Sequence, residues 1–132
     1  MAALDRIAVG SRYTLGAIRV VNGVLGLVAP GFIARRLGDQ HPDRNAAAIY
    51  GIRLFGVRTI VIGLDLLRPP GEARDRAVRA APLIHGSDTA TVLTLQRRKV
   101  LPSKMARPLA AISGVNTLLA VLSVLGSRRG RR

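Results

Sequence analysis

The chain contains no cysteine and no tryptophan, and aromatic residues make up only 3% of its 132 residues. The absence of cysteine excludes disulfide bonds, thiol catalysis and cysteine-ligated zinc or iron-sulfur centres. Acidic residues are also scarce, with 7 Asp and Glu against 21 Lys and Arg, and the 2 histidines offer little to any other metal site. We therefore expect no bound metal ion and no cofactor.

The scarcity of acidic residues gives a formal net charge of +14, which by itself would suit a nucleic-acid-binding protein. The basic residues, however, are bunched between long apolar runs, as they are in membrane proteins. This distribution argues against a nucleic-acid partner. The abundance of Ala, Gly, Val and Leu, with Arg strongly preferred to Lys, is typical of a GC-rich bacterial genome.

Four apolar segments approach the roughly 20 residues that a helix needs to cross a bilayer. They cover residues 13–34, 46–67, 78–95 and 105–125. The connectors between them are short, charged and rich in Pro and Gly, as turns between antiparallel helices usually are. The sequence therefore predicts an all-α fold with a single domain: an integral membrane up-down-up-down four-helix bundle with a basic C-terminal tail at 127–132.

A soluble, arginine-rich helical bundle is the competing interpretation, because a mean hydropathy of +0.27 is modest for four spans. The segment 105–125 decides against it. This segment has no charge after Arg107 and no polar stripe at helical period, which a soluble bundle helix should show. The first segment is longer than the core of an ordinary signal peptide, so we expect it to remain as a membrane helix.

Four spans place both termini on the same side of a cell membrane. The basic residues divide almost evenly between the two sides, with a slight excess on the side of the termini, so the positive-inside rule favours cytoplasmic termini. The basic tail and the arginines after the second segment suit anionic lipid headgroups on that side.

Several ionisable residues fall inside the predicted spans, where isolated charges are costly and usually face the bundle interior in pairs. We predict a buried polar network of Arg19, Arg58, Asp65, His85 and Asp88. Counted along the helices from the side of the termini, Arg58 and Asp88 both lie about 15 Å deep, and Arg19 and His85 about 10 Å deep. The sequence therefore predicts an ion pair between Arg58 and Asp88, and it places Arg19 level with His85.

Arg53 points away from Arg58 on the same predicted helix and has no partner in this network. A bound anion or a lipid phosphate could neutralise it, or its side chain could extend to the membrane surface. The network as a whole has two interpretations. It could only fix the register of the helices, or it could surround a polar cavity in which His85 relays protons.

No catalytic residue is predicted, since the sequence lacks a glycine-rich phosphate loop, metal-ligand spacing and a nucleophile with a base. The run HPDRN at residues 41–45 matches the loop tripeptide of chaperone J-domains, but membrane segments flank it here, so we interpret it as a turn. Asn45 or Asp43 would then cap the following helix.

A further set of features resembles small four-helix bacterial membrane proteins of the DoxX-like kind. These features are an apolar helix ending in Ala29-Pro30 and Leu37-Gly38, then Arg53, Gly56, Arg58 and Gly63 in the second span, then Asp88 in the third. The resemblance implies the same four-span fold and supplies no activity.

Together these features predict a non-enzymatic membrane protein that acts as an accessory or stabilising subunit of a bacterial membrane assembly. Its partners would be the lipid bilayer and either a larger membrane protein or further copies of itself. The alternative is a small carrier or a lipid- or anion-binding membrane protein that uses the buried Arg, Asp and His cluster.

Overall fold

The computed structural model describes residues 2–101 and 103–129, and over these residues the protein is all-α, as predicted. The described chain forms five α-helices and one short 3-10 helix: α1 (Ala2–Val28), α2 (Pro30–Arg36), η1 (Pro42–Arg44), α3 (Ala46–Leu67), α4 (Glu72–Arg97) and α5 (Ser103–Arg129). The last three residues of the predicted basic tail, 130–132, lie outside the described residues.

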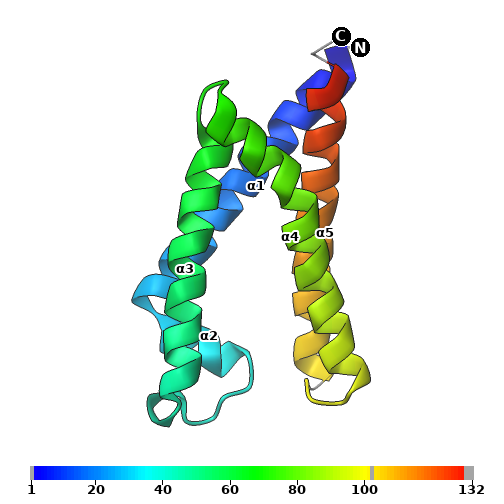
Figure 1. Ribbon diagram of the computed structural model, residues 1–132. Helices are drawn as coiled ribbons and strands as arrows, with labels where there is room; N and C mark the ends of the chain where they lie inside the picture. Colours follow the sequence, from blue (N-terminus) through cyan, green and yellow to red (C-terminus); the bar gives the residue numbers. More distant parts are fainter. Residues whose placement is uncertain (1, 102, 130–132) are drawn as a thin grey trace.

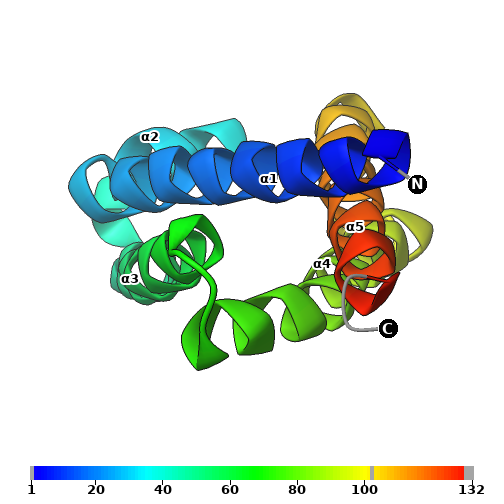
Figure 2. The same ribbon diagram turned by 90° about the horizontal axis from the view of Figure 1, so that it is seen from above.

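The long helices are arranged as two pairs that are joined at one end. Helix α1 packs along α3, α4 packs along α5, and α1 also contacts α5 near the two termini (Figure 1). Viewed from above, α1 runs across the molecule from α5 to α3 (Figure 2). Helices α3 and α4 approach each other near the turn that connects them and then diverge.

Glycines bring α1 and α3 into backbone contact. A Cβ atom added to Gly23 would lie 2.7 Å from the carbonyl oxygen of Gly56, and one added to Gly63 would lie 2.9 Å from the carbonyl oxygen of Gly16. Small residues permit this close approach, which is a common way for membrane helices to associate. The glycine positions in the two helices therefore decide that α3 packs on α1.

The core lies where the four long helices converge, next to the turn between α3 and α4. Its buried residues are Leu15, Leu66, Ala77, Val78, Ala81 and Ala120. The guanidinium of Arg12 donates a hydrogen bond to the carbonyl oxygen of Leu66 near the C-terminus of α3, where helix carbonyls lack partners within the helix. This end of the molecule holds the two pairs together.

The first predicted span, residues 13–34, is divided in the structure between α1 and α2, and this bent pair remains a candidate span. Helix α1 ends at Val28, and α2 leaves it at an angle of 105°. Pro30 is the cause, because its ring has no N–H to donate and disfavours helical backbone angles at the preceding residue. Ala29 accordingly has φ −132° and ψ 52°.

The second predicted span coincides with α3, Ala46–Leu67. The helix starts there because the side chain of Asn45 accepts a hydrogen bond from the backbone N–H of Ala48 at 3.0 Å, which confirms the predicted cap. It ends there because Arg68 precedes Pro69 and adopts an extended conformation.

Two helices in the described part of the chain are long and apolar enough to cross a membrane, namely α3 and α5, and the bent pair of α1 and α2 would make a third. These segments indicate a multi-pass membrane protein. Helix α4, which contains the predicted span 78–95, is not among the candidates. Its length of 26 residues is sufficient, but Asp88, Thr89, Thr91 and Thr94 interrupt its apolar sequence.

Candidate functional site

A buried arginine-histidine contact joins the two helix pairs just beyond the core. The Arg19 guanidinium of α1 lies 2.5 Å from Nε2 of His85 on α4, and the two residues are only 4% and 3% exposed. The residues that share the buried face of α1 with Arg19, among them Leu15, Gly16 and Gly23, orient it toward the interior. The predicted proximity of Arg19 and His85 is therefore present in the fold.

The chemistry of this contact determines how the proton on His85 is placed. An arginine side chain can only donate hydrogen bonds, so Nε2 of His85 accepts and carries no proton. The proton of the neutral imidazole is then on Nδ1, which lies 3.6 Å from Oδ2 of Asp88 on the next turn of α4. The result is a chain of three groups in which a neutral imidazole separates a cation from an anion.

Two further features belong to the Arg19–His85–Asp88 chain, namely a link to α5 and a buried donor. Thr89 donates a hydrogen bond to the carbonyl oxygen of His85, and its hydroxyl lies 3.1 Å from that of Thr117, which ties α4 to α5. Nε of Arg19 is buried and has no hydrogen-bond partner in the described part of the chain. The Arg19–His85–Asp88 chain thus includes a buried N–H donor that lacks a partner among the described residues, while the side chain of Asp88 is 42% exposed.

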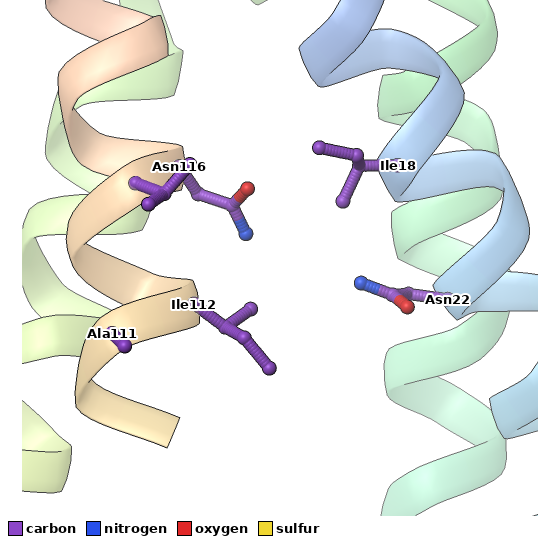
Figure 3. A pocket seen from close by; sticks show the side chains of 6 residues that line it. Ile18, Asn22, Ala111, Ile112 and Asn116 are labelled. Carbon is purple, nitrogen blue, oxygen red and sulfur yellow. The ribbon is translucent and has the colours of Figure 1, made fainter. Parts of the chain in front are cut away.

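A groove lies between α1 and α5, beginning on the turn of α1 that carries Arg19. Its volume is about 380 Å³, and it is open rather than enclosed. It is lined by Ile18, Asn22, Ala111, Ile112, Val115 and Asn116. The side chains of Asn22 and Asn116 point toward each other across it (Figure 3). Asn116 therefore belongs to the groove and not to the Arg19–His85–Asp88 chain.

The predicted ion pair between Arg58 and Asp88 is wrong. Arg58 is exposed, and no ion pair between the two residues occurs among the described side chains. The reason lies in the helix packing: α3 is bound to α1 through glycines and separates from α4 beyond the connecting turn. Equal depth along two helices does not bring residues together when the helices diverge.

Two other acidic and basic residues of α3 also lie apart from the buried chain. Asp65 is partly buried and pairs at 3.3 Å with Arg68, the residue that follows the end of its own helix, so it is not part of an interhelical network. Arg53 is exposed, and the anion or lipid contact expected for it stays a prediction. Of the five predicted network residues, the structure brings together Arg19, His85 and Asp88.

Asn22 was not identified from the sequence as a candidate site residue. It lies three positions after Arg19, so the two share one side of α1, and it is a carboxamide in an otherwise apolar stretch. A polar side chain at this depth is the signal that could have drawn attention to it.

Comparison with known protein families, with curated proteins and with solved structures finds no match to this chain. The resemblance to DoxX-like membrane proteins stays a prediction.

Proposed function

We propose that this protein is a non-catalytic accessory subunit of a bacterial membrane assembly and that it binds a larger membrane protein through α3. In this proposal all four long helices cross the membrane. Helix α4 crosses with the others because its most polar spanning residues, His85 and Asp88, are grouped with Arg19 instead of facing lipid singly.

The observation that carries the proposal is the position of Arg58. Helix α3 spans 22 residues, and Arg58 lies about 2 Å from its midpoint at about 1.5 Å per residue. The side chain is exposed and has no ion-pair or hydrogen-bond partner among the described residues. An arginine at the centre of a spanning helix costs about 2.5 to 3.5 kcal/mol on insertion scales unless it is paired.

The partner must therefore offer a negative charge at mid-membrane depth. An Asp or Glu on a helix of another protein would do so, and it would place apolar side chains of that helix against Leu54, Val57 and Val61, which are exposed on α3. Arg53 lies nearer the end of α3, where a lipid phosphate could neutralise it, so Arg53 does not require a protein partner. Arg58 is therefore the residue that indicates one.

The alternative of an anion carrier built on the buried cluster has less support. Arg19, the one buried arginine among the described side chains, is accompanied by the carboxylate of Asp88 through His85. This arrangement leaves no excess positive charge to attract an anion.

The test is extraction of the tagged protein from its native membranes in a mild detergent, followed by identification of whatever copurifies. We expect a larger membrane protein in fixed stoichiometry with the wild type. Arg58→Leu should lose this partner, Arg58→Lys should retain part of it, and Val57→Ala, a neighbouring change without a charge, should retain it.

Recovery of the wild type only as a free monomer would contradict the proposal. Recovery only as a homo-oligomer that depends on Arg58 would also overturn it, and would indicate that the half-exposed Asp88 of a second copy supplies the charge.

A further inference from the structure

The groove between α1 and α5 contains polar groups that the fold does not use. Asn116 is 9% exposed, points into the groove and has no hydrogen-bond partner among the described residues (Figure 3). Asn22 faces it from α1 and likewise has no partner among those residues. Buried polar side chains are normally hydrogen-bonded, so the buried but unpartnered Asn116, faced by the partly exposed Asn22, indicates a place where a ligand's polar group fits.

The rest of the groove wall is apolar. Ile18 lies on the α1 side, and Ile112 and Val115 lie on the α5 side, each of the latter two 53% exposed. No charged side chain lines the groove. Arg19 lies next to Ile18 in sequence, but its guanidinium is turned to His85. The groove therefore selects for an uncharged ligand with an apolar body, since nothing in its wall would compensate a charge.

The position of the groove indicates the route of entry. It lies between α5, which is a candidate membrane span, and α1, which belongs to the third candidate. Helices α1 and α5 are in contact near the termini and diverge toward the groove (Figure 1). A ligand dissolved in the bilayer could thus enter sideways, between the helices.

The size of the groove limits what it encloses. A volume of about 380 Å³ corresponds to roughly thirteen water molecules at about 30 Å³ each. This space is enough for one polar group and the first part of a hydrocarbon chain. The remainder of a long chain would extend along the exposed apolar side chains of α5.

From these observations we propose that the α1–α5 groove binds a neutral single-chain lipid, with an alcohol or ester group hydrogen-bonded between Asn22 and Asn116. A carboxamide donates through its NH₂ group and accepts through its oxygen, so the pair can satisfy both a hydroxyl and a carbonyl. This site is separate from the Arg58 surface and does not depend on the proposed assembly.

The test uses the full chain in detergent and a monoacylglycerol that carries a diazirine near the start of its acyl chain. We expect photolabelling to map to the groove, near Ile112 and Val115. Unlabelled monoacylglycerol should compete for the site. The corresponding fatty acid should compete less well because its negative charge would not be compensated in the groove. A plain alkane of the same length should compete less well by up to about tenfold for each hydrogen bond lost.

The variant Asn116→Leu should weaken labelling by up to about tenfold, and the double variant with Asn22→Leu should weaken it further. Leucine removes an unpaired amide, so these variants are expected to fold at least as well as the wild type. Thr94→Leu, a polar-to-apolar change at an exposed position of α4, is the matched control and should label normally.

A second measurement is the melting temperature with and without monoacylglycerol, which should rise for the wild type and not for the double variant. Equal labelling by the alkane, equal labelling of Asn116→Leu and wild type, or preference for the fatty acid would each overturn the proposal.

Discussion

Replacing Gly56 with alanine tests whether backbone contact between α1 and α3 holds the first helix pair together. A Cβ atom at this position would lie 2.7 Å from the carbonyl oxygen of Gly23 and 2.9 Å from the backbone nitrogen of Leu27. Both neighbours are backbone atoms, so no side chain can rotate away. The two helices must instead move apart, and overpacking of this kind typically costs about 1 to 3 kcal/mol.

Gly51 provides the matched control on the same helix. A Cβ atom there would meet nothing within 4 Å. Glycine to alanine in a helix also gains about 0.8 to 1 kcal/mol from helix propensity, and this gain is common to both variants. The difference in stability between Gly56→Ala and Gly51→Ala therefore isolates the steric cost, which we expect near the upper end of the 1 to 3 kcal/mol range.

The assay is equilibrium unfolding in mixed micelles of a mild detergent and SDS, followed by circular dichroism. Gly51→Ala should be as stable as the wild type or more stable, and Gly56→Ala should unfold at a clearly lower SDS fraction. Equal stability of the two variants would refute the reasoning that the glycines bring α3 onto α1.

Three further predictions concern the ionic residues and the cap of α3, each measured by the same unfolding assay. Arg19→Met and His85→Leu should be coupled by about 0.5 to 3 kcal/mol in a double-mutant cycle, because each single change leaves a buried partner unsatisfied; additive effects would contradict the contact. Arg58→Leu and Asp88→Asn should be additive within about 0.5 kcal/mol, because the two residues lie on diverging helices; measurable coupling would restore the pair predicted from the sequence. Asn45→Ala should destabilise the protein by about 0.5 to 2 kcal/mol through loss of the cap, and an unchanged stability would show that α3 needs no cap.

Local signals in the sequence predicted much of the secondary structure. The bounds of α3 follow from Asn45 at its start and Pro69 after its end, which act on the backbone within a few residues. The break at Ala29 has the same kind of local signal, since Pro30 follows it directly, yet the predicted span continued to residue 34. The apolar run that continues past the proline outweighed that signal. Such a run indicates a segment buried in the membrane, but it does not indicate that the segment is one continuous helix.

The candidate site was only partly predictable. The sequence gives the depth of a residue along its helix, but it does not say which other helix packs against that residue. Arg19 and His85 lie level, and their helices are close, so the prediction of proximity succeeded. Arg58 and Asp88 are level too, but their helices separate. Which helices stay together is decided by backbone contacts such as Gly23 with Gly56, whose geometry a linear spacing of glycines does not specify.

The sharp bend after α1 has a consequence for how the molecule is seated in its surroundings. With α1 crossing a bilayer, a bend of 105° turns α2 nearly parallel to the membrane plane. Phe32 and Arg36 of α2, whose ring and guanidinium lie 5.1 Å apart, then occupy the headgroup level, where aromatic and arginine side chains are favoured. In that orientation α2 would limit how deep α1 sits in the bilayer, and the glycine contacts would set the depth of α3 accordingly.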